Sequence, residues 1–409
     1  MDENGIENPP RRKLLANTAG VLAAGGLAGW SVGASAQIGP VVAPTAPKPL
    51  PAYVAWKDPG VMIVHTGNTL ETRRSAFGTS VITPNEQVYI RNNLPPPGAE
   101  IVADRDAWEV TIEGVRQPRT LTVKALKSLN LETIATVLQC SGNGRGLFPS
   151  KPSGTPWQVG AAACVVWSGV PVSAVAEMLG GVVDGMIYLT GTGGEKLPDG
   201  IDPKSVMVER SVPVAAMADA LLAWEMNGVP ISLAHGGPLR LIVPGYNGVN
   251  NVKYIKRLTF TRQQSDAAIQ KTGYRMSPPG EKGDPSQPSV WEMTGKSWIN
   301  SPGPESGPVT AGLVQVKGVG FGGMQAVKLI EVSADEGRSW KPARLVGPDL
   351  GKYAWRQFVF PIVLAPGTHT LACRVTDIQG KVQAEGRTEN TGGYSNSSWR
   401  DHAIKVTVV

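Results

Sequence analysis

Apolar and polar residues alternate over short stretches along the first two thirds of this 409-residue chain. Alternation with a period of two indicates β-strands with one buried face, and residues 108–112 and 239–243 have strand-like patterns of this kind. Residues 174–179 and 214–222 instead have the apolar spacing of helices. We therefore predict an α+β domain over residues 61–276.

The last hundred residues carry strand and turn patterns alone. Apolar runs separated by Gly, Pro and Asp clusters lie at 312–319, 326–332, 353–363, 369–376 and 404–409. Short strands at this spacing predict an immunoglobulin-like sandwich, which we place at residues 308–409. Residues 277–307 are dense in Pro, Gly and Ser, and we expect a linker there. Residues 37–60 are rich in Pro and Ala and are expected to form an extended leader rather than a packed element.

Residues 1–36 have the layout of an export signal. Arg11 and Arg12 precede an apolar stretch over residues 14–30, and a small-residue cleavage motif ends at Ala36. The stretch is rich in Gly and Ala and shorter than the roughly 20 strongly apolar residues of a membrane span, although an N-terminal membrane anchor is the alternative. Paired arginines predict twin-arginine export to the periplasm, with no membrane span after the signal is removed.

Charge and cysteine content exclude several classes of protein. Lys and Arg exceed Asp and Glu by 39 to 33, and the resulting charge of +6 is spread without basic runs. Nucleic-acid binding is therefore not expected, and the charge indicates solubility or an anionic substrate. The cysteines Cys140, Cys164 and Cys373 are scattered and form no CxxC motif, which argues against a disulfide framework, a zinc ribbon and covalent haem.

The first window with candidate chemistry is TVLQCSGNGRGLF at residues 136–148, where a strand pattern runs into a Gly-rich loop. Cys140 and Arg145 lie in this loop, and the small residues around Cys140 would let a bulky group approach its sulfur. Arg145 would attract anions to the same place. The alternative is a buried structural cysteine before a turn, because free Cys is among the most buried residue types.

Two further windows place basic residues beside turns. Arg91 follows a strand pattern and precedes a proline-stiffened turn at residues 94–97, where it could hold an oxyanion in a bidentate fork. His235, Arg240 and Lys253 surround one apolar strand that is flanked by Gly-rich turns, an arrangement suited to a phosphate. The alternatives are a surface arginine in the first window and structural hydrogen bonding in the second.

Taken together, these windows resemble the sulfite oxidase family of molybdenum enzymes, most closely its haem-free bacterial periplasmic sulfite dehydrogenases. YIRNNLP (89–95) is similar to the family's arginine turn, LQCSGNGRG (138–146) to its molybdenum-cysteine loop, and HGGPLR (235–240) with VKY (252–254) to its pterin-phosphate segment. The similarity continues through EMNG, GYRM and SADEGRSW and covers nearly the whole mature chain. It implies an α+β molybdopterin-binding domain of the sulfite oxidase fold, followed by an immunoglobulin-like dimerisation domain.

The resemblance also implies a molybdenum-molybdopterin cofactor and no haem in this chain. Cys140 would be the thiolate ligand of the metal, because soft sulfur ligands suit molybdenum. The residues implied to hold the pterin and its phosphate are Arg91, Asn92, Asn93, His235, Arg240, Asn251 and Lys253. An acidic pterin contact is implied as well, and Asp199 and Asp202 are equal candidates for it.

By the same resemblance, the reaction is oxidation of sulfite to sulfate by oxygen-atom transfer. Arg91 and Arg145 would bind the anionic substrate and stabilise its charge. Tyr274 would donate a hydrogen bond, and Trp157 would form a wall of the pocket. The resemblance implies a homodimer that passes electrons to a separate c-type cytochrome.

One feature departs from animal members of the family, which carry a further pocket arginine near the C-terminus. Residues 390–396 of this chain contain no arginine, and Arg387 and Arg400 are the nearby ones. Three other functions compete with sulfite oxidation: a sulfane dehydrogenase of a thiosulfate-oxidising complex, a sulfoxide reductase of the same superfamily, and a cofactor-free binding protein. Absence of the sandwich from sulfoxide reductases argues against the second, and the joint presence of Cys140, Arg91 and Tyr274 argues against the third.

Overall fold

The computed structural model describes residues 48–409, so the predicted export signal lies outside the described residues. In the N-terminal α+β part of this range, a small sheet joins β1 (Met62–Thr66), β2 (Thr69–Thr72) and β3 (Ile90–Arg91). A second sheet has the order β5 (Arg119–Thr122), β4 (Glu109–Glu113), β13 (Ile255–Thr261), β8 (Tyr188–Gly193) and β9 (Glu209–Pro213). A third has the order β11 (Val229–Pro230), β10 (Leu221–Met226), β7 (Ala162–Pro171) and β6 (Glu132–Gln139), with β12 (Arg240–Ile242) also paired to β10. Short helices accompany these sheets: α1 (Val123–Leu126), α2 (Val172–Met178), α3 (Pro203–Val206) and α4 (Ala268–Lys271).

Local sequence explains several of these elements. The strand β4 alternates buried Val110 and Ile112 with more exposed neighbours, as the predicted strand at 108–112 requires. The helix α2 confirms the predicted helix at 174–179, and the left-handed residues Gly180 and Gly181 follow its C-terminus. The strand β12 confirms the predicted strand at 239–243.

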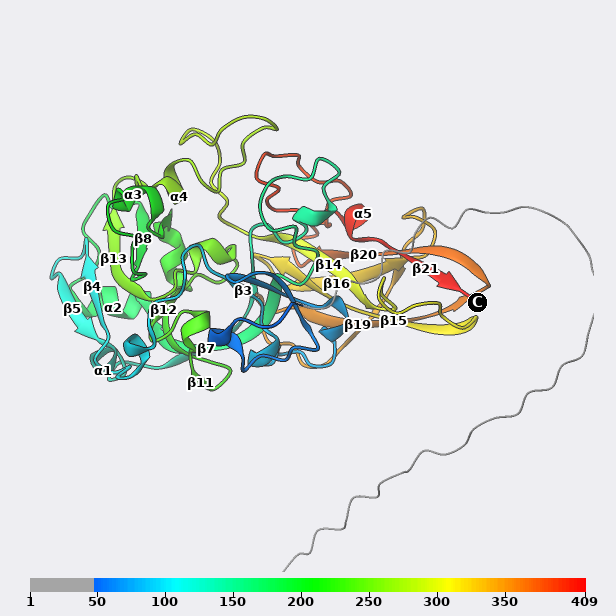
Figure 1. The fold of residues 1–409 in the computed structure, drawn as a ribbon, viewed down its shortest axis with the longest axis horizontal. Helices are drawn as coiled ribbons and strands as arrows, with labels where there is room; N and C mark the ends of the chain where they lie inside the picture. Colours follow the sequence, from blue (N-terminus) through cyan, green and yellow to red (C-terminus); the bar gives the residue numbers. More distant parts are fainter. Residues whose placement is uncertain (1–47) are drawn as a thin grey trace, which may run out of the picture. The chain divides into compact units, whose positions relative to one another are not determined.

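The C-terminal part is a sandwich of two antiparallel sheets, drawn from yellow to red in Figure 1. One sheet has the order β14 (Thr294–Ser301), β15 (Gly312–Gly323), β19 (Arg356–Leu364) and β18 (Arg344–Val346). The other has the order β17 (Lys341–Pro342), β16 (Val327–Ser333), β20 (Gly367–Asp377) and β21 (Ile404–Val408), and the short helix α5 (Trp399–His402) precedes β21. Apolar side chains from both sheets, among them Val316, Phe358 and Cys373, form the core between them. This confirms the predicted all-β sandwich, and its immunoglobulin class stays a prediction.

A shared core joins the sandwich to the α+β part. Trp298 of β14 and Phe321 of β15 pack in one cluster with Val137 of β6 and Cys164 of β7. The end of β6 therefore lies at the junction of the two parts, and the loop that follows β6 contains Cys140.

The structure differs from the sequence predictions in three places. The range 214–222 is not one helix, because a 3-10 turn (Val214–Ala218) ends before β10 begins at Leu221. The strand β10 pairs with β7 along one edge and with β12 and β11 along the other, and it is almost wholly buried. Its apolar run therefore lacks alternation, and periodicity cannot distinguish it from a buried helix.

The other two differences concern segments rich in proline. The range 277–307 includes β14, whose buried residues pair with β15, so this part of the expected linker belongs to the sandwich. The range 37–60 includes a 3-10 turn (Ala52–Val54), and Val54 packs in a buried cluster with Leu70 of β2 and Ile90 of β3. In both cases flanking Pro and Gly residues concealed a short segment that packs.

Among residues 48–409, the helices are all too short or too polar to cross a lipid bilayer.

Candidate functional site

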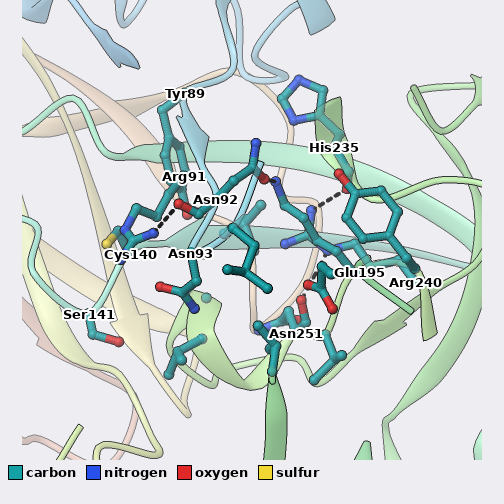
Figure 2. Close-up of a pocket in the computed structure, with 18 of the residues that line it drawn as sticks. Tyr89, Arg91, Asn92, Asn93, Cys140, Ser141, Glu195, His235, Arg240 and Asn251 are labelled. Carbon is teal, nitrogen blue, oxygen red and sulfur yellow. Dashed lines mark hydrogen bonds between the residues drawn. The ribbon is translucent and has the colours of Figure 1, made fainter. Parts of the chain in front are cut away.

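A cavity of about 700 Å³, open solvent at its mouth included, lies where the ends of β3, β6 and β12 approach one another. Nine of the residues singled out from the sequence line it: Arg91, Asn92, Asn93, Cys140, His235, Arg240, Asn251, Lys253 and Tyr274. Tyr89, Ser141 and Glu195 also contribute to its walls. In the view of Figure 2, Cys140 and Arg91 lie on the left and Glu195, Asn251 and Arg240 on the right. Windows that are far apart in the sequence therefore meet at one cavity.

The cysteine loop turns sharply at the end of β6. Cys140 donates its backbone N–H to the carbonyl of Ala161 at 2.9 Å, and its own carbonyl accepts from Asn143 at 2.9 Å. Gly144 has φ of +95°, a left-handed conformation that favours glycine. A Cβ on Gly142 would come within 2.6 Å of Nη2 of Arg145. The glycines thus permit a tight turn that leaves the Cys140 thiol at the cavity wall, where a soft metal could reach it.

Basic side chains come together at the end of the cavity next to β12. The Nζ of Lys253 donates to Oδ1 of Asn92 at 2.6 Å and to the carbonyl of Ala234 at 2.7 Å. Arg240 is 3% exposed, and its Nη1 donates to the carbonyl of His235 at 2.8 Å. Burial lowers the pKa of Arg240 to about 10 and that of Lys253 well below its usual range. Neither Arg240 nor Lys253 forms a salt bridge with a carboxylate of the described residues. These two buried basic side chains therefore fit an anionic group such as a phosphate.

His235 enters this arrangement as a neutral ring. It is 1% exposed, and its Nε2 lies 3.2 Å from the Nζ of Lys57. Burial and the positive charges of Lys57 and Lys253 lower the pKa of His235 well below its usual value. Lys57 is itself 2% exposed, and burial lowers its pKa to about 7. Lys57 was missed from the sequence because it falls in the proline-rich segment expected to be a leader.

The acidic residue at the cavity is Glu195. Its Oε2 is buried without a hydrogen-bond partner among the described residues, and burial raises its pKa to about 7 although Lys253 lowers it. Asp199 and Asp202, the candidates from the sequence, are exposed and do not line the cavity. Asp202 instead caps α3 by accepting from the N–H of Lys204 at 3.1 Å. The sequence gives no signal that separates Glu195 from these nearby acids.

Asn93 and Asn251, both predicted to hold the pterin, differ in how free their side chains are to contact a bound group. Oδ1 of Asn251 accepts from the N–H of Val243 at 2.9 Å, and its Nδ2 donates to the carbonyls of Tyr246 and Asn247. Its side chain therefore shapes the loop after β12. Asn93 is exposed at the cavity and is free to contact a bound group through its amide.

Two predicted catalytic residues do not line the cavity. Trp157 is fully buried and packs against Tyr89 and His65, with ring centroids 6.3 Å and 5.2 Å away. It is a core residue behind the wall that Tyr89 forms, which contradicts its predicted role as a pocket wall. Arg145 lies beside the cavity in the cysteine loop and donates from Nε to the carbonyl of Gly392 at 2.8 Å.

The arginines near the C-terminus serve the sandwich rather than the cavity. Arg387 forms a salt bridge to Asp401 at 2.7 Å and another to Glu389. Arg400 pairs with Glu385 and is largely exposed. Neither residue lines the cavity, so neither takes the place of the further pocket arginine that is missing from residues 390–396.

The cavity suits a polar group with an anionic end. Buried atoms that line it and lack a hydrogen-bond partner among the described residues include Nδ2 of Asn92, Oγ of Ser141 and Oε2 of Glu195. Buried polar atoms in native structures are normally paired, so these atoms indicate the position of a ligand or of water. Together with the Cys140 thiol and the cations Arg240 and Lys253, they offer a donor set for a metal-bearing cofactor with a phosphate.

Comparisons with known proteins agree with this donor set. Residues 97–269 match the oxidoreductase molybdopterin binding domain, and residues 287–408 match the Mo-co oxidoreductase dimerisation domain. The second match begins before β14 and so includes this strand, which lies in the predicted linker.

Among curated relatives, a sulfite oxidase of Arabidopsis thaliana is 29% identical over 82% of this chain and 91% of that protein. The mitochondrial sulfite oxidase of Homo sapiens is 30% identical over 80% of this chain, which spans 62% of the human protein. The solved structure of the sulfane dehydrogenase SoxCD from Paracoccus pantotrophus has a TM-score of 0.68 and 22% identity, covering 85% of this chain and 89% of that chain.

Proposed function

Because the chain belongs to the sulfite oxidase family of molybdopterin oxidoreductases, we propose that it oxidises sulfite to sulfate by oxygen-atom transfer. The observation that carries this proposal is the Cys140 thiol at the wall of a cavity whose other end holds Arg240 and Lys253. A soft ligand for the metal and buried basic groups for the phosphate are what a metal-bearing pterin with a phosphate requires.

The residues of the cavity fit the molybdenum cofactor. Cys140 would ligate the metal, Arg240 and Lys253 would bind the phosphate, and Glu195 would accept hydrogen bonds from the pterin. When bound, the cofactor supplies the two-electron oxidation of the sulfur atom. His235 is held neutral beside Lys57, so it would donate or accept a hydrogen bond rather than contribute a charge.

The remaining residues of the site would handle the substrate. Arg91 lines the cavity near Cys140 in Figure 2 and would bind the sulfite dianion. Tyr274, at the cavity wall, would donate a hydrogen bond to the anion, and Arg145, which lies beside the cavity, would add its positive charge. Each arginine contact to a dianion contributes about 1.5–3 kcal/mol, which is the usual range for hydrogen bonds to charged groups.

The cellular setting is part of the proposal. Arg11 and Arg12 support twin-arginine export to the periplasm. Electrons would pass to a separate c-type cytochrome, as the resemblance to haem-free sulfite dehydrogenases implies, because two electrons must leave the site after each turnover. The match of residues 287–408 to a dimerisation domain supports a homodimer.

The test is sulfite-dependent reduction of ferricyanide and of cytochrome c by exported, purified protein, with molybdenum and pterin measured on the same sample. Cys140→Ser should abolish turnover. The matched control is Cys373→Ser, which lies in the sandwich core beside the Ser297 hydroxyl and should keep activity.

Each alternative has its own outcome in this assay. Molybdenum-loaded protein that oxidises a sulfane sulfur but not sulfite would replace the proposal with sulfane dehydrogenase activity. Properly exported protein without molybdenum and pterin would refute the enzyme and support a binding protein on the same fold.

A further inference from the structure

An aromatic pair links the C-terminal sandwich to the wall of the cavity. Tyr394 lies in the loop between β20 and α5, and its ring stacks on Tyr274 with centroids 5.0 Å apart and planes 19° from parallel. The guanidinium of Arg210 lies 5.6 Å from the Tyr274 ring centroid, and that of Arg145 lies 5.4 Å from the Tyr394 ring centroid. Each stacked ring is therefore contacted by one guanidinium as well.

The loop that carries Tyr394 is tied to the cysteine loop by hydrogen bonds. The N–H of Ser395 donates to the carbonyl of Ser141 at 2.8 Å, and Nδ2 of Asn396 donates to the carbonyl of Gly144 at 3.1 Å. The sandwich thus contributes directly to the conformation of the loop that presents Cys140.

The loop is also closed within itself. Asn390 is 3% exposed, its Oδ1 accepts from the N–H of Tyr394 at 2.8 Å, and its Nδ2 donates to the carbonyl of Tyr394 at 3.0 Å. Ser395 and Tyr274 have φ of 55° and 50°, in the left-handed region that residues other than glycine rarely adopt. Such conformations persist where the surrounding structure holds them, and they are enriched at functional sites.

The phenol of Tyr394 is neutral in this setting. Its pKa is raised to about 12, chiefly by burial and also by Tyr274 and Cys140, while Arg145 and Arg91 act in the opposite direction. Tyr394 therefore lies within electrostatic reach of the groups assigned to ligand and substrate contacts, and it acts through the face of its ring rather than through a charge.

We infer that Tyr394 is a positioning residue that holds Tyr274 at the cavity wall and the Arg145 guanidinium beside it, in the orientation that favours binding of the substrate anion. Arg145 donates from Nε to Gly392 and from Nη1 to the carbonyl of Thr155 at 3.1 Å, so the ring face and these bonds together fix the guanidinium plane. A side chain that is already ordered loses little conformational entropy when the anion binds. The inference rests on the proposed roles of Arg145 and Tyr274 in binding the anion.

The test compares Tyr394→Leu with Tyr394→Phe in the molybdenum-loaded protein. Tyr394→Leu removes the ring face and should raise the KM for sulfite and the Kd for inorganic sulfate about tenfold, with kcat within twofold. Tyr394→Phe keeps the face and should leave both constants within twofold. Tyr188→Leu breaks an aromatic pair that lies outside the cavity, with Trp291 at 6.4 Å, and serves as the matched control.

Molybdenum content and the thermal midpoint identify loaded, folded protein. Unchanged KM and Kd in loaded Tyr394→Leu would overturn the inference, and so would an equal loss in Tyr394→Phe. If Tyr394→Leu does not yield loaded protein, Asn390→Ser releases the loop with the ring intact, and unchanged constants in that variant would overturn the inference instead.

Sulfate binding separates this inference from the proposed function. The proposed function would be refuted if the wild-type protein did not oxidise sulfite. The positioning role would still be supported if Tyr394→Leu, and neither Tyr394→Phe nor Tyr188→Leu, bound sulfate more weakly than the wild type. Sulfite turnover that is insensitive to these substitutions would refute the positioning role alone.

Discussion

The buried amine of Lys296 should make the stability of the native protein depend on pH. It lies in β14, is 1% exposed, and donates from Nζ to the carbonyl of Asn143 in the cysteine loop at 3.0 Å. Burial, followed by the positive charge of Arg74, lowers its pKa from 10.5 to about 7. Between these two pH values the unfolded chain binds a proton that the native protein does not, so native stability rises as pH increases from about 7 towards 10.5.

The magnitude follows from the width of that window. One pKa unit corresponds to about 1.4 kcal/mol, so raising the pH from 7.5 to 9.5 should add about 2.5 kcal/mol through Lys296 alone. With an unfolding entropy of about 2.1 cal/mol/K per residue over about 360 residues, this is a rise of about 3 °C in the thermal midpoint.

The perturbation is Lys296→Met, which removes the titrating amine and keeps an unbranched side chain. The variant also leaves the carbonyl of Asn143 without this donor, at a cost of about 1–3 kcal/mol that does not depend on pH. The assay is therefore the change in thermal midpoint between pH 7.5 and 9.5, measured for wild type and variant. The difference between the two changes should be about 3 °C.

The control is Lys317→Met, on an exposed position of β15 in the same sheet, which should behave as the wild type does. Equal changes in midpoint for wild type and Lys296→Met would refute the reasoning, because the amine would then be charged in the native protein throughout this range.

Three further predictions concern residues around the site and the sheets that support it. Glu195→Gln should weaken cofactor retention about tenfold, because one acceptor oxygen facing the pterin becomes an amide donor. Molybdenum and pterin content after dialysis measures the loss. Burial raises the pKa of Glu209, but hydrogen bonds from Ser265, Thr192 and Lys204 lower it to about 2. The ionised Glu209 carboxylate therefore stabilises the protein above pH 4.5, and this contribution is lost as the pH falls towards 2. Glu209→Gln should lower the free energy of unfolding by about 1–2 kcal/mol at pH 7 and by less at pH 3. Thermal melts at the two pH values measure the difference. Trp157→Phe should keep kcat/KM and cost about 1 kcal/mol of stability, since its ring packs in the core, and a large loss of kcat/KM at unchanged stability would contradict that placement.

Strands were predictable where their burial is one-sided. The sandwich strands β15, β16, β19, β20 and β21 match the predicted apolar runs, because turns rich in Gly and Pro separate them clearly. The strand β10 was mistaken for part of a helix, because a strand buried by neighbours loses its alternation. The strand β14 was missed because Pro and Gly residues around it dominate the composition of its window.

The site residues also fall into those that the sequence identified and those that it did not. Arg91, Cys140 and the segment from His235 to Lys253 were identified because each lies in a contiguous window with a recognisable composition. Glu195 lines the cavity and Lys57 contacts His235 behind it, and both lie in segments whose local sequence carries no comparable signal. Trp157 was assigned to the cavity by resemblance, and the packing of Tyr89 in front of it decides otherwise.

By itself, the sequence determined the order of an α+β part and a β sandwich, the cysteine loop, and the basic windows, because periodicity and short motifs are local properties of a chain. Only the tertiary structure decided that Glu195 faces the cavity while Asp202 caps a helix, and that Tyr394 of the sandwich stacks on Tyr274. These placements depend on contacts between residues far apart in the chain, and on which charges become buried when those contacts form. Burial and pairing are set by the whole fold, so neither can be read from a residue's immediate neighbours in the sequence.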